Sequence, residues 1–121
     1  MQRILDKIPT RVWVSGGDEE LNMQFSDGTS CKWYHEQDCC ESVGINDITG
    51  DLQGLVGLPL LVAEKRTSEG DPAPDLGYEP ESCTWTFYTF RNVNVSVDVR
   101  WFGESNGYYS EGVSFRYVGP N

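Results

Sequence analysis

The sequence predicts a mainly β domain, at most α+β, with about eight mostly antiparallel strands. Two observations lead to this class. Apolar and polar residues alternate with a period of two over most of the chain, and the alternating segments are rich in β-branched and aromatic residues. Gly, Asp and Asn separate the segments, as is typical of short turns. About eight strands exceed what one flat sheet easily holds, so we expect a curved sheet, a partial barrel or two packed sheets.

The 121 residues are expected to form a single domain, 1–121, because a second core would not fit in this length. A short helix is expected near 51–56, where Asp51 can cap the first turn and Leu52, Leu55 and Val56 share one face. Gly57 follows and is suited to end it. The expected strands are 11–15, 20–26, 30–36, 41–48, 60–67, 83–91, 93–103 and 108–118.

The turn at Ser26-Asp27-Gly28 sets the register of the first predicted hairpin. A two-residue loop at Asp27-Gly28 would place apolar residues opposite polar ones. A three-residue loop with Gly28 at positive φ makes one face consistently apolar, so we favour it. The pairs that it predicts are Phe25 with Thr29, Met23 with Cys31, and Leu21 with Trp33.

The same reasoning applied to Ser105-Asn106-Gly107 predicts a hairpin between the last two strands, with Gly107 at positive φ. The pairs predicted for this second hairpin are Val99 with Val113, Val97 with Phe115, Val95 with Tyr117, and Trp101 with Glu111.

Three tryptophans in alternating runs, Trp13, Trp33 and Trp85, are expected in the core.

The balance of charge excludes one class of partner. Nine Lys and Arg against nineteen Asp and Glu give a formal net charge of -10, so direct nucleic-acid binding is not expected.

The segment 68–82 is long and rich in Pro, Gly and acids. This composition is typical either of a binding loop or of a flexible, solvent-exposed loop, and we favour the second interpretation. No stretch has the length of a membrane span or an export signal, so we expect a cytoplasmic protein without a membrane anchor.

The four cysteines, Cys31, Cys39, Cys40 and Cys83, are expected to be free thiols in a reducing compartment. Zinc bound by Cys31, His35, Cys39 and Cys40 is the alternative. Its geometry is poor, because Cys31 and His35 lie four strand residues apart, roughly 13 Å. We therefore expect no metal site and no cofactor.

The densest group of functional side chains joins the third and fourth predicted strands. A Cys39 or Cys40 nucleophile with His35 as its base would give a hydrolase or transferase. The surrounding carboxylates raise the pKa of a thiol and so oppose that chemistry, and a hydrogen-bonded structural His35 is favoured. The group consists of His35, Glu36, Gln37, Asp38, Cys39, Cys40, Glu41 and Ser42.

A second concentration of aromatic and small polar residues surrounds the tip of the last predicted hairpin. Aromatic rings can stack on a planar ligand while Ser, Asn and carboxylate groups bind its edges, although turn and core roles are the favoured interpretation. No phosphate-binding Gly-Lys-Ser or Gly-Lys-Thr loop occurs. The candidate ligand residues here are Arg100, Trp101, Glu104, Ser105, Asn106, Tyr108 and Tyr109.

Two strings, His35 to Val43 (HEQDCCESV) and Trp101 to Glu111 (WFGESNGYYSE), carry a resemblance that covers the chain from about Trp13 to Val118. Together with the segments 45–52 and 83–88 they resemble an uncharacterised domain family of bacteriophages and some bacterial genomes. The resemblance implies a phage-encoded accessory protein in the cytoplasm of the bacterial host, acting on host processes by binding. It implies no catalytic residue and no ligand.

Three functions follow as hypotheses. The preferred one is a counter-defence protein that sequesters a small nucleotide-like ligand between the 35–42 segment and the aromatic tip, with Lys65, Arg91 or Arg100 as the cation. The second is an acidic inhibitor of a basic host nuclease or nucleic-acid-binding effector, and the third is the Cys/His enzyme. Self-association through an edge strand is also compatible with the pattern. The first hypothesis requires the two segments to lie side by side.

Overall fold

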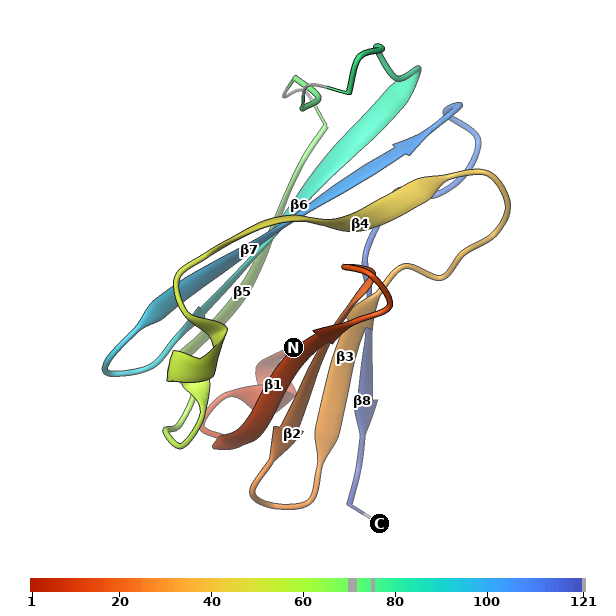
Figure 1. Ribbon diagram of the computed structural model, residues 1–121. Helices are drawn as coiled ribbons and strands as arrows, with labels where there is room; N and C mark the ends of the chain where they lie inside the picture. Colours follow the sequence, from red (N-terminus) through yellow and green to blue (C-terminus); the bar gives the residue numbers. More distant parts are fainter. Residues whose placement is uncertain (70–71, 75, 121) are drawn as a thin grey trace.

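Two antiparallel four-stranded sheets make up the computed structural model, which describes residues 1–69, 72–74 and 76–120, and they form no closed barrel (Figure 1). The first sheet has the order β1-β2-β3-β8 and the second has the order β4-β7-β6-β5. The predicted mainly β class with eight antiparallel strands is therefore confirmed, and of the three arrangements that the sequence left open the observed one is two packed sheets. In chain order the elements are η1 (Gln2–Ile4), β1 (Pro9–Ser15), β2 (Glu20–Phe25), β3 (Ser30–Tyr34), β4 (Ser42–Thr49), η2 (Leu52–Leu55), β5 (Val62–Ser68), β6 (Ser82–Arg91), β7 (Ser96–Ser105) and β8 (Ser114–Val118).

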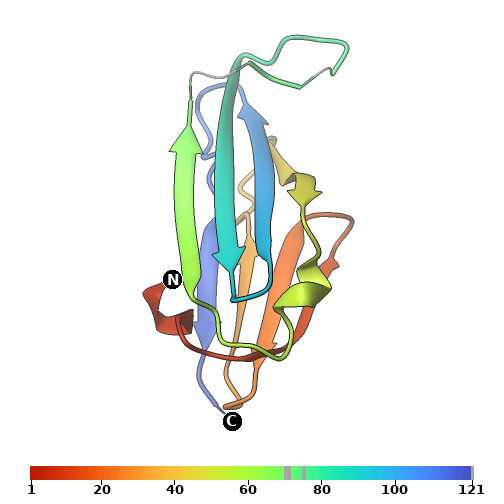
Figure 2. The same ribbon diagram turned by 90° about the vertical axis from the view of Figure 1, so that its left-hand side faces the viewer.

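The core lies between the two sheets, which face each other (Figure 2). Strand β7 shows how the alternation positions side chains, because Val97, Val99 and Trp101 are fully buried while Asp98 and Arg100 are exposed. Aromatic rings from both sheets meet in the middle of the core. The ring of Trp33 on β3 lies 5.0 Å from that of Phe90, 5.2 Å from that of Phe115 and 5.9 Å from that of Tyr88, measured between centroids.

Strands that follow one another are neighbours within β1-β2-β3 and within β5-β6-β7, and the other connections cross the molecule. The chain passes from the first sheet to the second between β3 and β4, and it returns between β7 and β8. Between β4 and β5 it runs from one edge of the second sheet to the other through η2 (Figure 1). The cap of this turn is confirmed, since the Asp51 side chain accepts from Gln53 N at 3.0 Å. The turn is 3₁₀ and buries Leu55.

The first predicted hairpin is confirmed in its register. Met23 pairs with Cys31 and Leu21 with Trp33, and Phe25 N donates to Thr29 O at 2.9 Å. Gly28 has a φ of 86°, as the three-residue loop requires. One side of this hairpin consequently enters the core.

The second predicted hairpin is wrong in its pairing, although Gly107 does have a positive φ of 90°. Strand β7 already has β4 on one side and β6 on the other, so no edge is open to the last strand. Val99 pairs with Ile48 and Tyr88 instead of Val113. The segment 106–113 therefore crosses to the first sheet, where β8 pairs with β3.

The three tryptophans expected in the core have different positions. Trp33 is fully buried between the sheets. Trp85 is also buried, but on the outer face of the second sheet, where its Nε1 donates to Pro72 O at 3.0 Å. Trp13 is half-buried, with the guanidinium of Arg11 4.2 Å from its ring.

Part of the expected loop 68–82 lies outside the described residues, namely 70, 71 and 75. Within the described ranges, no helix combines the length and the apolar character needed to cross a bilayer.

Candidate functional site

Three chain segments, 35–41, 76–81 and 104–113, meet at one end of the sandwich, which we call the loop end (Figure 1). The first and third line a cavity of about 470 Å³. A second cavity, of about 300 Å³, is lined by Cys40 together with parts of the other two segments. The strand register brings these segments together, because the pairs Ser42 with Glu104 and Cys83 with Glu104 place the ends of β4, β6 and β7 side by side.

His35 joins two of these segments from the end of β3. Its Nδ1 lies 2.7 Å from Gly112 O, and its Nε2 lies 2.8 Å from Glu41 Oε2. The side chain is 4 % exposed. Both ring nitrogens are thus engaged by oxygen atoms, one of a carbonyl group and one of a carboxylate. An imidazole held on both sides in this way is positioned as a structural group and not as a general base.

Glu41 is the centre of the hydrogen bonds within the 35–41 segment. Besides His35, its carboxylate accepts from Asp38 N at 3.1 Å, Cys39 N at 2.8 Å and Gln37 Nε2 at 3.1 Å. Burial raises the pKa of Glu41, but the hydrogen bonds from Cys39 N, His35 and Asp38 N outweigh it and hold the pKa at about 2. The carboxylate is therefore ionised and serves to fix the shape of the segment.

Glu111 has the same role in the 104–113 segment. Its buried carboxylate accepts from Thr84 Oγ1 at 2.8 Å and from Ser105 Oγ. Ser105 Oγ in turn accepts from Gly107 N at 2.9 Å. These hydrogen bonds fix the segment that leaves β7 against the beginning of β6.

Carboxylates also surround Cys83 and Tyr78 at the loop end. Burial, followed by the charges of Glu111 and Glu104, raises the pKa of the Cys83 thiol. The Tyr78 hydroxyl donates to Glu104 Oε1, and this bond raises the pKa of the tyrosine. The other oxygen, Oε2 of Glu104, is buried without a hydrogen-bond partner among the described residues.

The expectation of four free thiols is wrong for two of the cysteines. Cys39 and Cys40, adjacent in a bend, are joined by a disulfide, while Cys31 and Cys83 are free. The thiol nucleophile that the enzyme hypothesis requires beside His35 is therefore absent from this arrangement. In the described part of the chain no three His, Cys, Asp or Glu side chains are grouped in a way that could hold a metal ion.

Most of the predicted ligand residues do come together at the loop end. Ser42 is exposed at the start of β4. Tyr108 is 83 % exposed and packs edge-on against Tyr109, with the ring centroids 5.0 Å apart. The residues that line the two cavities of the loop end are His35, Glu36, Gln37, Asp38 and Glu41 in the larger one, and Glu104, Ser105 and Asn106 in the smaller one.

Two predicted ligand residues lie elsewhere. Trp101 is fully buried between the sheets, so it cannot stack on a ligand, and its Nε1 has no hydrogen-bond partner in the described structure. Arg100 lies on the outer face of the second sheet, where it donates to Asn46 Oδ1 at 2.8 and 3.1 Å. Successive strand residues face opposite sides, so neither side chain could join the loop-end cavities from this register.

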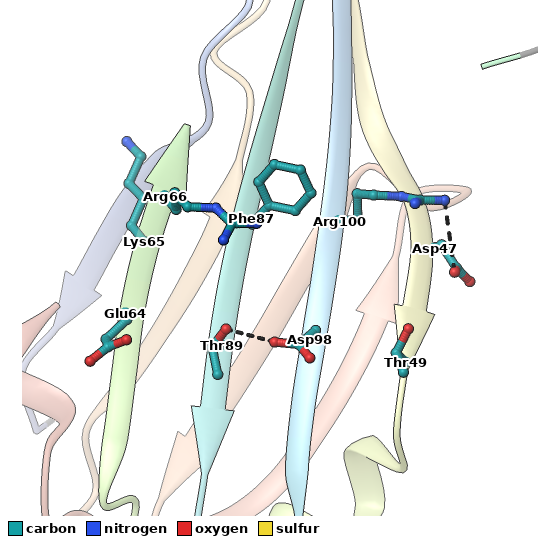
Figure 3. A pocket seen from close by; sticks show the side chains of 9 residues that line it. All are labelled: Asp47, Thr49, Glu64, Lys65, Arg66, Phe87, Thr89, Asp98 and Arg100. Carbon is teal, nitrogen blue, oxygen red and sulfur yellow. Dashed lines mark hydrogen bonds and ion pairs between the residues drawn. The ribbon is translucent and has the colours of Figure 1, made fainter. Parts of the chain in front are cut away.

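The outer face of the second sheet holds a further cavity, of about 430 Å³ (Figure 3). Lys65 and Arg100, two of the cations considered from the sequence, line it. Arg66 and Phe87 also line it and were missed. Phe87 alternates with buried residues on β6, whereas β5 has no such alternation, and the proximity of Arg66 to Phe87 depends on the pairing of β5 with β6.

The negative charge is concentrated at the loop end. The three segments of the loop end, 35–41, 76–81 and 104–113, carry seven of the nineteen Asp and Glu residues and no Lys or Arg. The nine basic residues all lie outside these segments.

The fold and this site define the molecule as a two-sheet β-sandwich with an acidic end built from three connections. The chain matches the model of the family described as Domain of unknown function (DUF7448) over residues 2–115, and it belongs to that family. Membership of an uncharacterised domain family is thereby confirmed. No match to the chain was found among curated proteins or among solved structures.

Proposed function

We propose that this chain is a non-enzymatic binding protein whose loop end docks onto a basic surface of a partner protein. The observation that carries the proposal is the segregation of charge, with seven carboxylates and no Lys or Arg in the segments that form this end. Like charges gathered on one side produce a local field that attracts a basic surface and repels nucleic acid.

The hydrogen bonds of the loop end support the proposal, because they present the charged surface in a fixed shape. His35 ties the 35–41 segment to Gly112, and Glu111 ties the 104–113 segment to β6. A surface that is already ordered loses less conformational entropy on binding. Tyr78 and Tyr108, which are 59 % and 83 % exposed, add the aromatic contact area that protein interfaces favour.

The chemistry of the partner follows from the charge. A basic nuclease or a nucleic-acid-binding effector exposes clustered Lys and Arg that normally contact phosphates, and an acidic domain can occupy that surface in place of nucleic acid. Given the resemblance to a phage family, we place this activity in counter-defence within the bacterial host cytoplasm.

A nucleotide-like ligand held at the loop end receives less support. Trp101, the largest ring proposed for stacking, is fully buried. The cavities there are lined by carboxylates, and the imidazole of His35, which lines the larger one, already has both ring nitrogens engaged. A phosphate would meet negative charge with no free donor of opposite sign.

The test uses the full chain, immobilised, and extracts of bacterial cells at about 0.05 M and about 0.5 M NaCl. We expect a basic protein to be retained at low salt, released at high salt, and lost when Glu79→Lys and Glu81→Lys are combined. The matched control, Glu64→Lys with Asp98→Lys, makes the same change in net charge away from the loop end and is expected to retain the partner.

Thermal unfolding of both double variants shows whether each is folded. Retention that is identical in the two variants, or that does not weaken with salt, contradicts the proposal, because charge at the loop end would then not determine binding.

A further inference from the structure

The outer face of the second sheet presents three cross-strand rows of side chains toward solvent. Arg66, Phe87 and Arg100 are partners in one row across β5, β6 and β7. The row on one side of it contains Trp85 and Phe102. The row on the other side contains Glu64, Thr89, Asp98 and Thr49. The row with the two arginines and the row with the two carboxylates thus lie side by side in one open cleft (Figure 3).

The two guanidinium groups lie on aromatic rings. The Cζ atom of Arg66 is 4.6 Å from the centroid of Phe87, and that of Arg100 is 5.1 Å from the centroid of Trp85. The rings of Trp85 and Phe87 are nearly parallel, at 19°, and Phe102 packs against Trp85 at 4.9 Å. A guanidinium held flat on a ring keeps its N–H edge and its outer face available to a ligand.

Neither arginine is tightly committed to a partner within the chain. Arg66 has no ion pair and no hydrogen bond among the described residues. Arg100 extends toward Asp47 on β4 (Figure 3). It also donates to Asn46, which lies at a bulge between Ile45 and Asp47. Its ion pair with Asp47 is long, at 3.8 Å, and both side chains are about half exposed. Such an exposed pair contributes little and can be exchanged for a stronger anion.

The acidic row supplies acceptors at a fixed distance from the arginines. Thr89 Oγ1 donates to Asp98 Oδ1 at 2.6 Å, which orients that carboxylate, and Glu64 lies beyond Thr89 on β5 (Figure 3). Two residues along a strand correspond to roughly 7 Å. A ligand that spans both rows must therefore carry an anionic group at one end and hydrogen-bond donors at the other.

We propose that this cleft binds a small nucleoside phosphate. The phosphate accepts from the N–H edges of the Arg66 and Arg100 guanidinium groups, and the base stacks on the outer face of a guanidinium. The ribose hydroxyls or the exocyclic amine donate to Asp98 and Glu64. The cavity of about 430 Å³ is in the size range of small-ligand sites. Longer nucleic acids are disfavoured, since the acidic row and the net charge of -10 would repel each further phosphate.

The experiment is calorimetric titration of the purified full chain with the four ribonucleoside monophosphates, and with inorganic phosphate and adenosine as partial ligands. We expect at least one monophosphate to bind about tenfold or more tightly than either partial ligand. Combining Arg66→Gln with Arg100→Gln is expected to weaken that binding about tenfold or more. The matched control, Arg11→Gln with Arg116→Gln, removes the same charge from the first sheet and is expected to bind normally.

Three outcomes overturn the proposal: no binding of any monophosphate at millimolar concentration, inorganic phosphate binding as tightly as the nucleotides, or equal affinities of the two double variants. Amide chemical shifts of the unmodified chain provide a second measurement that does not depend on the variants. Nucleotide addition is expected to shift residues on β5, β6 and β7 around Arg66, Phe87 and Arg100. Shifts confined to the loop end would contradict the proposed location.

Discussion

Gly103 is the position where the loop end is most sensitive to a single methyl group. A Cβ atom at Gly103 would lie 2.5 Å from Glu111 O, 3.0 Å from Glu111 Cβ and 3.1 Å from Val43 Cγ2. The backbone φ is not in the left-handed region, so close approach, and not conformational freedom, is the reason for glycine here. Gly103→Ala therefore tests the packing of the 104–113 segment on the second sheet.

The magnitude follows from the displacement that the methyl group requires. The Glu111 carbonyl would have to withdraw by about 0.9 Å to reach an ordinary contact of 3.4 Å. Overpacking of this kind costs about 1–3 kcal/mol. The shift also strains the hydrogen bonds of Glu111 with Thr84 and Ser105, each worth about 1 kcal/mol or more. We expect Gly103→Ala to lower the free energy of unfolding by about 3 kcal/mol.

Urea unfolding followed by tryptophan fluorescence measures this change. With an m value of about 2 kcal/mol per molar urea, the midpoint should fall by about 1.5 M while m stays constant. Gly119→Ala is the matched control, because Gly119, like Gly103, has no positive φ and an added Cβ there would meet nothing within 4 Å. A midpoint for Gly103→Ala within about 0.3 M of the wild type refutes the reasoning, since Glu111 would then be free to move.

Three further predictions concern stability and titration. Gly28→Ala and Gly107→Ala should each lower the free energy of unfolding by about 1–2 kcal/mol, because both glycines have positive φ and their surroundings leave room for a methyl group; unchanged urea midpoints would show that the turns can rearrange. Glu41 has its pKa lowered from 4.5 to about 2, so the stability that it contributes is present above about pH 4.5 and is lost as the pH falls toward 2. A Glu41→Gln variant should show a flatter decline in melting temperature over that range, and parallel curves would exclude this role. Burial raises the pKa of Cys31 to about 12, and that of Cys83 is also raised, so iodoacetamide at neutral pH should modify both thiols only after unfolding, as mass spectrometry would show.

The first hairpin could be predicted in register because its information is local. Gly28 restricts the loop to one geometry, and a shift by one residue would turn Met23 and Leu21 away from the core. The pairing of the last hairpin could not be predicted, because the alternation of Val97 and Val99 with polar residues is compatible with any antiparallel neighbour. The pairs that they actually form come from β4 and β6, which are distant in sequence.

The candidate site was predictable in part for the same reason. The 35–41 and 104–113 segments lie close together, as expected from the sequence. The 104–113 segment, however, is a connection between the two sheets and not the tip of a hairpin. The burial of Trp101 could have been predicted, because Trp101 faces the same side of its strand as Val97 and Val99. The contact of Arg66 with Phe87 could not have been predicted, because it requires the register of β5 against β6. The disulfide between Cys39 and Cys40 was missed because the expectation for all four cysteines was taken from a reducing compartment and not from their adjacency.

The return of the chain from β7 to β8 has a consequence for how binding competence arises. Gly112, whose carbonyl oxygen is hydrogen-bonded to His35 Nδ1, lies just before β8, the strand that completes the first sheet beside β3. The acidic surface therefore acquires its final shape only when the two layers have docked and the last strand has been added. A chain shortened before residue 110 would keep all four strands of the second sheet with their arginines, yet it would lose Gly112, the partner of His35. Binding of a partner at the loop end would then require the complete fold.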